Sequence, residues 1–518
     1  MFIHFCTSPA VPRGDQSVKT QPAMEIISWN FLLFTLTVLL AYYLLNRRAQ
    51  NILLLCTSLA FICFHTWINL IPLAVITGVT YYCGLKLKSP AGRNWLAAGL
   101  IVQVSAFVFY HAVNSPMFGL PARIAQTGTL FFAEEWLVPL GFSFYILQAA
   151  GYLIDLYRNR LEPERDFIDF CLYLTFFPKF LAGPIERAGN FLPQLKSART
   201  VDNDRFARGL TLILFGLFRK VALAEVLLSI LPAGILHAAS ETAPLAAGLP
   251  PASILQYAEV ISYGDRVIGL IAYGIYLYND FAGYTGIMRG ISLLMGIELS
   301  PNFRQPFFSA SLSDFWSRWH ISLTSWLRDY LYFPLTRCLK MRFNQTFSPA
   351  PIVLPLLITM LAAGIWHGLT VPFLVWGLSY AVVMILELWV FQRWPSLRPA
   401  QRNRLYRWLT GLLTFAVVTL AWVPFTAGSW AEILASGRAL LYGHGWNLRL
   451  DFSPWIPVLV CISFLLDYLQ AQKKDELFLL SWPLPARASM LAVILFILFL
   501  AFIWTSPYTS NVFIYQSF

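Results

Sequence analysis

The stretch LAAGIWHGLTVPFLVWGLSY, from Leu361 to Tyr380, contains no Asp, Glu, Lys or Arg and has one histidine, His367. Apolar stretches of about 20 residues cross a lipid bilayer as helices. An ionisable side chain in hydrocarbon is costly, so one that is kept there is a candidate for function. The stretch therefore predicts a membrane protein with an imidazole at membrane depth.

The composition of the whole chain agrees with a protein that lies largely in the membrane. Of its 518 residues 58% are hydrophobic and only 12% are charged, whereas soluble domains have about 25% charged residues. The formal net charge is +11. Because Lys and Arg mark the cytoplasmic loops of membrane proteins, this excess indicates topology, and we expect no nucleic-acid partner.

Apolar segments alternate with short basic loops along the chain, which predicts an all-α polytopic protein. We expect roughly eleven to thirteen membrane segments, some of them partial. The loops rich in Lys and Arg are predicted to be cytoplasmic and the N-terminus to lie outside. The candidate segments are 27–45, 52–85 (a hairpin), 95–113, 137–154, 167–183, 210–231, 267–278, 281–297, 351–366, 371–391, 408–425, 454–469 and 490–503.

One apolar segment, 167–183, is too short for a full crossing and is interrupted by proline, glycine and Lys179. Basic residues stand on both sides of it, which favours a re-entrant segment that enters and leaves on the cytoplasmic face. Broken backbone at membrane depth is tolerated only against protein or a water-filled cavity. The stretch FPKFLAGPIER therefore predicts a cavity wall.

The N-terminal residues, one long loop and the cysteines provide no candidate catalytic or metal-binding residues. Residues 1–23 lack the apolar core of a signal peptide, so we expect a disordered or mis-called extension before Met24 and a single membrane domain over 24–518. Residues 232–257 are expected to form an outer loop. The seven cysteines show neither a zinc-binding spacing nor a disulfide framework, and no metal site is expected.

A second histidine, His320, lies in the stretch RWHISLTSWLRDYLYFPL (318–335). The spacing predicts an interfacial helix over 311–330 that begins with a capping box formed by Ser311 and Asp314. In such a helix His320 shares the apolar face with Trp316. Two interpretations stay open, a functional imidazole or a histidine at interface depth whose N–H groups are satisfied by the backbone.

His367 is predicted to lie deeper than His320. If the segment 351–366 enters from the cytoplasmic side, its sixteen residues rise about 24 Å at ~1.5 Å each, which is most of a core of about 30 Å. Imidazole is the side chain best suited to take a proton from a hydroxyl near neutral pH. The alternative is a structural histidine that donates to a carbonyl of a neighbouring helix.

Four other ionisable residues fall in apolar surroundings, and we expect structural roles for them. They are Asp155, Lys179, Asp280 and Arg289. Such residues serve more often as hydrogen-bond or ion-pair partners than as catalysts. Asp280 and Arg289 flank the glycine-rich stretch YNDFAGYTGIMRG, where they would hold the shape of a cavity.

Six stretches together resemble the membrane-bound O-acyltransferase (MBOAT) family, and most closely its bacterial alginate O-acetyltransferase branch. The WHISL and WHG histidines stand 47 residues apart, and the combination of the two motifs is specific. The resemblance extends from about residue 24 to 518. The stretches are PLGFSFYILQAAGYLIDLYR (139–158), FFPKFLAGPIER (176–187), YNDFAGYTGIMRG (278–290), DFWSRWHISLTSWLRDYLYFPL (314–335), GIWHG (364–368) and FIYQSF (513–518).

The resemblance implies a ring of tilted helices around a thin core, with cavities from both sides that meet near the two histidines. It implies that His367 is catalytic and that His320 acts with it. The candidate substrate-binding residues are Lys179, Trp319, Arg328, Asp329 and Trp366. Two stretches depart from the pattern of the family: DFAGYTG has Ala282 and Gly286 where a hydroxyl and a carboxylate are frequent, and WVPFTA has Pro424 and Thr426.

The function that this resemblance implies is transfer of an acyl group, with acetyl the best fit. The donor would be a cytoplasmic thioester such as acetyl-CoA, and no bound cofactor is expected. The acceptor would be a hydroxyl of an exported polysaccharide such as alginate, or a periplasmic acyltransferase partner that carries the group onward. His367 would remove the hydroxyl proton, and no G-x-S-x-G nucleophile elbow is present. We expect the protein in the bacterial inner membrane, in contact with lipid.

Two other functions remain open at this point. The first is D-alanyl transfer from a carrier protein, which uses the same chemistry with another acyl group. The second is a glycan or lipid transporter or flippase in which the histidines relay protons. Many transporters contain inverted repeats, and none is visible in this sequence.

Overall fold

The computed structural model describes residues 26–114, 139–199, 202–231, 262–343, 350–442 and 452–505, and all regular structure in these ranges is helical. Eight of the helices are long and apolar enough to cross a membrane. The chain is therefore a multi-pass membrane protein, and the predicted total of membrane segments stays a prediction. The eight are α2 (Arg47–His65), α3 (Leu70–Lys86), α4 (Gly92–Asn114), α19 (Ala350–His367), α20 (Val371–Arg393), α21 (Arg404–Thr426), α23 (Trp455–Lys473) and α24 (Leu484–Thr505).

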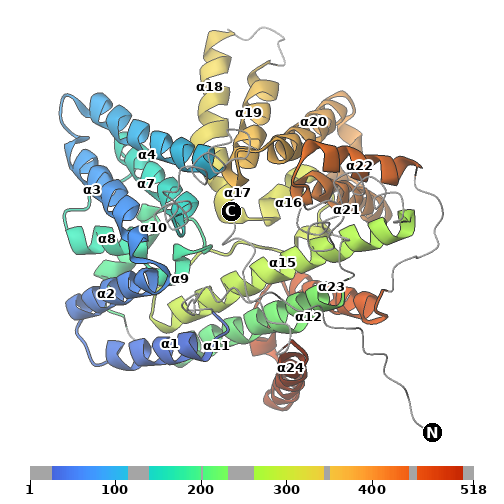
Figure 1. Ribbon diagram of the computed structural model, residues 1–518, viewed down its shortest axis with the longest axis horizontal. Coiled ribbons are helices and arrows are strands. Elements are labelled where there is room, and N and C mark those ends of the chain that lie inside the picture. The colour runs from blue at the N-terminus through green and yellow to red at the C-terminus, as the bar shows by residue number, and fades with distance from the viewer. Residues whose placement is uncertain are drawn as a thin grey trace, which may run out of the picture.

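The long helices surround a centre made of short ones (Figure 1). Near the middle of the view lie α16 (Leu312–Arg318) and α17 (Ile321–Leu327), and the long helix α15 (Tyr263–Leu294) passes beside them. On one side are α1 (Trp29–Tyr42), α2 to α4 and α7 (Phe142–Tyr157), and on the other are α19 to α21 with α22 (Trp430–Tyr442). The extension 1–23, the loop 232–257 and the stretch 513–518 lie outside the described residues.

The hairpin predicted over 52–85 is confirmed, since α2 and α3 are separate helices joined by a tight turn at Trp67–Asn69. Asn46 caps the start of α2 by accepting a hydrogen bond from the backbone N–H of Ala49. Asn69 fixes the turn, because its side chain accepts from the backbone N–H of Leu140 just before α7 (3.1 Å). Capping and turn chemistry thus decide where this apolar stretch folds back.

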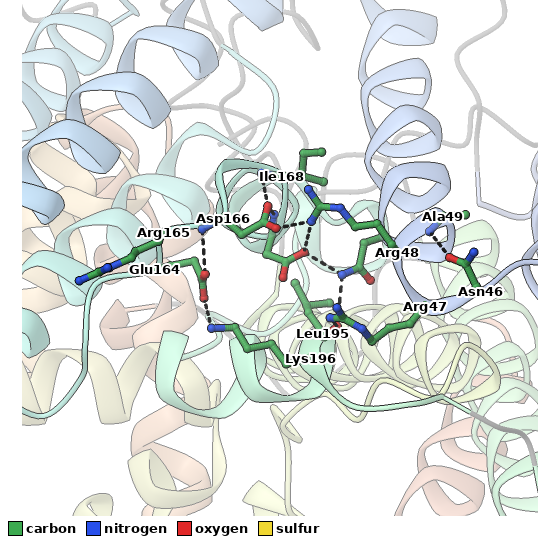
Figure 2. Close-up of polar contacts among 12 residues, drawn as sticks. Asn46, Arg47, Arg48, Ala49, Glu164, Arg165, Asp166, Ile168, Leu195 and Lys196 are labelled. Atoms are coloured by element: carbon green, nitrogen blue, oxygen red, sulfur yellow. Dashed lines mark hydrogen bonds and ion pairs between the residues drawn. The ribbon is translucent and has the colours of Figure 1, made fainter.

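The segment 167–183 forms two short helices, α8 (Phe167–Thr175) and α9 (Phe177–Phe180), neither long enough to cross a bilayer. Its two flanks meet, because Glu164 pairs with Lys196 at the end of α10 (Ala188–Lys196) (2.6 Å; Figure 2). Arg47 at the start of α2 also donates to the carbonyl of Leu195. The segment therefore leaves one side of the molecule and returns to it, as a re-entrant segment must.

An ion pair between Arg48 and Asp166 closes the same cluster (Figure 2). Asp166 also caps α8, accepting hydrogen bonds from the backbone N–H groups of Ile168 and Asp169. Burial raises the pKa of Asp166, but Arg48 and the two N–H groups outweigh it and hold the pKa of that carboxyl below its ordinary value. The start of the re-entrant segment is therefore held by a charged carboxylate.

The segment predicted at 210–231 carries two buried cations in its middle and contains a π-helical turn there. It consists of α11 (Asn203–Leu217), the π turn at Phe218–Glu225 and α12 (Val226–Ile230). Arg219 pairs with Asp467 of α23 and Lys220 pairs with Asp280 of α15. A π turn widens the helix locally and is frequent at functional or strained positions. Both charges are thus neutralised by partners on other helices.

The segments 267–278 and 281–297 were predicted as two pieces, and this division is wrong, because α15 runs unbroken for 32 residues. Ser262 and Asp265 form a capping box at its start. The polar pair Asn279 and Asp280 does not interrupt the helix, since Arg219 donates to Asn279 and Lys220 to Asp280. Because these two polar side chains have partners on another helix, α15 continues through them without a break.

Glycine lets α15 approach α11 closely. A Cβ atom at Gly283 would lie 2.7 Å from the carbonyl oxygen of Gly216, and one at Gly286 would lie 3.2 Å from the Cα of Gly216. Small residues at crossings of this kind are typical of membrane helices. The departure from the family pattern at Gly286 therefore has a packing reason, since a carboxylate side chain there would push the two helices apart.

We predict that the two flanks of the re-entrant segment lie on the same side of the membrane. In a cysteine-free background, Arg160→Cys and Asn190→Cys should react with an impermeant maleimide from one and the same side of oriented vesicles. Both positions are exposed, so failure to react would not come from burial. Labelling from opposite sides would show a true crossing and contradict the arrangement.

Candidate active site

The helix predicted over 311–330 is broken at His320, which corrects the single interfacial helix. The Ser311 cap is confirmed by the bond from the Asp314 N–H (3.1 Å), whereas the Asp314 carboxylate accepts from the N–H of Ala310. At His320 the backbone turns into the left-handed region, with φ 43° and ψ 53°. A non-glycine residue there is uncommon. The shared helical face of Trp316 and His320 was therefore a wrong inference.

His320 lies in the interior of the protein and is 1% exposed. Its ring stands edge to face against Phe281 (4.9 Å between ring centroids) and Trp366 (5.6 Å). Asn302 fixes the start of α17 just after it, because the backbone N–H of Ile321 donates to the Asn302 carbonyl and that of Ser322 to its side-chain oxygen. The left-handed turn is thus held in place by a loop that comes after α15 in the chain.

His367 is the last residue of α19 and is 5% exposed. Four aromatic rings surround its imidazole, with centroids between 4.9 and 5.8 Å away: Trp366, Phe373, Trp376 and Phe425. These rings come from α19, α20 and α21. The imidazole therefore lies in an aromatic box, which is defined by these four residues.

Close packing of α19 against α20 fixes the position of the aromatic box. A Cβ atom at Gly364 would lie 2.3 Å from the Phe373 carbonyl oxygen, and one at Gly377 would lie 2.4 Å from that of Met360. At Gly368 a Cβ atom would meet the Phe373 ring at 2.9 Å. Three glycines thus bring the two backbones together at the level of His367.

The two histidines are brought together through Trp366. Its ring contacts both imidazoles, and its indole N–H points to the carbonyl of Ser143 in α7 (3.5 Å). His367 also interacts electrostatically with His320 and with His111 near the end of α4. Sequence reasoning missed His111, although a histidine inside the predicted segment 95–113 was the same kind of signal as His367.

The site can perform general acid-base chemistry in surroundings that exclude water. A neutral imidazole takes a proton from a hydroxyl through its unprotonated ring nitrogen. The rings around His367 lower the local dielectric, which strengthens every electrostatic interaction with a reacting group. Two imidazoles that share Trp366 therefore offer one proton acceptor and one hydrogen-bonding partner for a substrate.

The ammonium of Lys179 already has partners within the protein. It is completely buried and donates to the side chain of Gln148 and to the carbonyl of Tyr173. The rings of Tyr173 and Phe191 each lie 5.0 Å from its nitrogen. In this structure Lys179 ties the re-entrant segment to α7, and its role in binding a substrate stays a prediction.

The other predicted substrate-binding residues are divided between two places. Trp319 is buried beside His320 in the chain, where its ring stacks on Phe315 (5.5 Å) and contacts Trp422. Arg328 and Asp329 follow the end of α17 (Ile321–Leu327), and the Arg328 guanidinium donates to the Asp329 carboxylate (3.1 Å). The structure therefore places Trp366 against both histidines and Trp319 next to His320 in the chain, whereas Asp329, which accepts from Arg328, lines a basic surface.

That basic surface is a broad basin of about 1,700 Å³, which we call the donor basin, and sequence reasoning did not find it. Arg158 and Arg160 from the end of α7 line it, together with Arg337 and Lys340 of α18 (Phe333–Arg342) and the carboxylate of Asp329. Pro351 and Ile352 at the start of α19 also line it. The basin and His367 thus lie at opposite ends of α19.

Comparisons with known proteins show the family to which the chain belongs. The model of the membrane-bound O-acyltransferase family, MBOAT, matches residues 158–423. That range contains both histidines, the donor basin and most of the aromatic box, and the chain belongs to this family. The protein is thus a membrane O-acyltransferase.

Among curated proteins, the chain is similar to the probable alginate O-acetylase AlgI of Pseudomonas syringae pv. tomato, with 32% identity over 82% of this chain and 75% of the relative. It is 27% identical to the peptidoglycan O-acetyltransferase of Helicobacter pylori over 79% of this chain and 78% of the relative. It is also 27% identical to the teichoic acid D-alanyltransferase of Streptococcus thermophilus, over 62% and 75%. The transporter alternative is therefore set aside.

We predict that His367→Ala abolishes acyl transfer while the protein still accumulates in the membrane. Loss of a general base lowers turnover by about 10²–10⁴-fold. Acyl groups on the acceptor are quantified per amount of membrane protein, with Cys461→Ser as a matched control at an exposed position on α23. More than half of the wild-type activity in His367→Ala would contradict the assignment.

For His320 we expect a graded series, with Asn the best tolerated replacement. Asn adopts the left-handed backbone that this position needs more readily than Gln or Ala, and its amide keeps a hydrogen-bonding group. Activity should fall in the order His, Asn, Gln, Ala at matched protein levels. An inactive His320→Asn together with an active His367→Asn would show that the two histidines have the opposite roles.

Proposed function

We propose that this protein transfers an acetyl group from acetyl-CoA on the cytoplasmic side to a hydroxyl of an exported polysaccharide, or to a periplasmic partner that carries the group onward. The observation that supports this most directly is the placement of His367 in an aromatic box at the end of α19, next to His320. In a family of O-acyltransferases, this is where a hydroxyl and a thioester would meet. The named relatives that act on alginate and peptidoglycan support a polysaccharide acceptor.

The aromatic box favours a small acyl group. The centroids of its four rings lie within 5.8 Å of that of the imidazole, so a short chain is the easiest to accommodate beside His367. A D-alanyl group carries an ammonium, and aromatic rings can hold a cation, as Tyr173 and Phe191 do for Lys179. The box therefore does not separate the two groups by charge, and the relatives named for O-acetylation favour acetyl.

The reaction needs no covalent enzyme intermediate. His367 takes the proton of the acceptor hydroxyl while the hydroxyl oxygen attacks the carbonyl carbon of the thioester. The new ester bond forms as the carbon-sulfur bond breaks, and the sulfur leaves as a thiolate that recovers a proton. Since a thiolate is a good leaving group, the imidazole and correct positioning account for the chemistry.

The donor basin is the proposed entrance for the phosphates of coenzyme A. Four cations line it against the single carboxylate of Asp329, and arginine and lysine are the residues that hold phosphate groups. Arg158 and Arg160 belong to a loop that the positive-inside rule makes cytoplasmic. The nucleotide would stay in the basin while the linear arm of the cofactor carries the acetyl group toward the histidines.

D-alanyl transfer remains the second candidate, because a relative of this chain is a teichoic acid D-alanyltransferase.

An assay with both donors separates acetyl transfer from D-alanyl transfer. Purified protein in nanodiscs is incubated with radiolabelled acetyl-CoA and oligomers of alginate or peptidoglycan, and in parallel with a D-alanyl carrier protein. Transfer from the carrier protein alone would overturn the proposal, whereas His367-dependent transfer from acetyl-CoA would support it.

We predict that the charge reversal Arg337→Glu/Lys340→Glu raises KM for acetyl-CoA about tenfold or more, which corresponds to ~1.4 kcal/mol of lost attraction. The value of kcat should change little, because both side chains lie in the donor basin. The effect should weaken at high salt, as expected for exposed charges.

Acetyl-pantetheine, which lacks the phosphates, is the control donor, and its KM should not respond to the same reversal. Arg404→Glu/Arg407→Glu is the control variant, since both arginines are exposed at the start of α21 and do not line the basin. Equal loss with both donors, or in both variants, would contradict the proposed entrance.

A further inference from the structure

Three aromatic side chains form a compact triangle next to the aromatic box. Ring centroids lie 5.9 Å apart for Trp316 and Trp376, 5.0 Å for Trp316 and Tyr380, and 5.3 Å for Trp376 and Tyr380. The three rings meet edge to face and come from two elements, α16 and α20. We call them the polar triangle because each carries one polar hydrogen.

None of these three polar hydrogens has a hydrogen-bond partner among the described residues. The indole nitrogens of Trp316 and Trp376 and the hydroxyl of Tyr380 are all buried without one, and the residues are 8%, 2% and 1% exposed. Buried polar groups in native proteins are nearly always satisfied, because leaving one without a partner costs stability. Three such groups in contact therefore need an explanation.

The fold satisfies comparable groups elsewhere. The hydroxyl of Tyr42 donates to the carbonyl of Met295 (2.8 Å), that of Tyr173 donates to the carbonyls of Gln148 and Glu186, and the indole of Trp326 donates to the carbonyl of Leu147 (2.8 Å). The helical bundle thus offers carbonyl partners to buried aromatic donors in other places. Two other buried aromatic donors, those of Tyr145 and Trp422, likewise have no partner among the described residues. The polar triangle differs from them because it brings three such donors into ring contact with one another beside the predicted base.

Its position connects it to both histidines. The Trp376 ring packs edge to face on His367 (5.1 Å), so it belongs to the aromatic box as well. On the other side, the Tyr380 ring stacks parallel to Phe315 (6.5 Å), which in turn stacks on Trp319, the residue before His320. A substrate that reaches His367 therefore comes close to these donors.

We propose that the polar triangle is an uncharged hydrogen-bonding subsite for the carbonyl oxygen of the acyl group, with Trp376 as a further catalytic residue. This rests on the proposed acyl transfer. When the acceptor oxygen bonds to the carbonyl carbon, the carbonyl oxygen gains negative charge, which the Trp376 N–H stabilises by donating to it. Tyr380 and Trp316 extend the subsite. The charge returns to form the carbonyl again as the carbon-sulfur bond breaks and the thiolate leaves.

Neutral donors suit this place better than charged ones. A buried cation needs hydrogen-bond partners of its own, as Lys179 has in Gln148 and Tyr173, whereas preorganised N–H and O–H groups need no counter-ion and do not reorganise during the reaction. The stability lost by leaving them without protein partners would be recovered when the substrate supplies an acceptor oxygen. The subsite also favours a carbonyl over an alkyl chain at this point.

The decisive variant is Tyr380→Phe, which removes one oxygen atom and keeps the ring. If the hydroxyl serves the substrate, thermal stability should stay the same or rise, while kcat falls about tenfold or more. For Trp376→Phe we expect about a 10²-fold fall in kcat, the loss typical of one oxyanion donor. Because Phe is smaller than Trp, a benzothiophene analogue of tryptophan at position 376, which keeps the shape and lacks the N–H, must show the same loss.

Tyr42→Phe is the matched control, because its hydroxyl has a carbonyl partner far from the histidines. It should lose thermal stability and keep its turnover per folded molecule, which is the opposite pattern. Wild-type turnover in both Tyr380→Phe and the benzothiophene variant would overturn the proposal.

The failure of the proposed function would be distinguishable from the failure of this subsite. If the wild-type protein transfers D-alanyl groups and not acetyl groups, the same variants are measured with that donor. A selective loss of kcat would still support the subsite, because D-alanyl thioesters have the same carbonyl. An unchanged kcat with the active donor would overturn it.

Discussion

A bilayer offers no water to a buried polar group, so each charge inside this protein depends on a partner from another part of the chain. Arg219 and Lys220 stand side by side on a π turn, and each pairs with a carboxylate of a different helix, Asp467 or Asp280. Such pairs do not raise stability much over an apolar core, but breaking one is costly. They therefore fix which helices are neighbours, and the rest of the ring depends on these choices.

The need of every buried polar group for a partner also draws attention to the groups near the two histidines. Lys179, a predicted substrate-binding residue, is held by Gln148 and Tyr173, whereas the polar triangle has no such partners among the described residues. Near the C-terminal end of α15, Arg289 and Glu476 form two hydrogen bonds of 2.6 and 2.7 Å. Burial raises the pKa of Glu476, yet Arg289 holds the pKa of that carboxyl below its ordinary value. The charged groups named here thus have partners within the protein, whereas the three neutral donors of the polar triangle have none among the described residues.

Apolar length and basic loops were enough to predict most long helices, because both properties are local. α20 was expected over 371–391 and runs from Val371 to Arg393. The break at His320 could not be predicted in the same way, since the helical spacing continues through it and the turn is held by Asn302 in the loop after α15. The continuity of α15 was missed for the same reason, because the partner of Asp280 lies 60 positions earlier in the chain.

The candidate site shows a similar division. The two histidines and Trp366 could be found from motifs, since their positions in the chain are characteristic. The donor basin and the polar triangle depend on which surfaces meet, and no spacing in the sequence encodes that.

The donor basin and His367 lie at opposite ends of α19, which gives the site a polarity along this helix. This helix has 18 residues, which corresponds to about 27 Å at ~1.5 Å per residue. The cations of the donor basin lie beside its first turn, and His367 is its last residue. A donor with charge at one end and a thioester at the other end of a flexible arm matches that polarity, whereas a compact donor would have to leave the cations to reach the base.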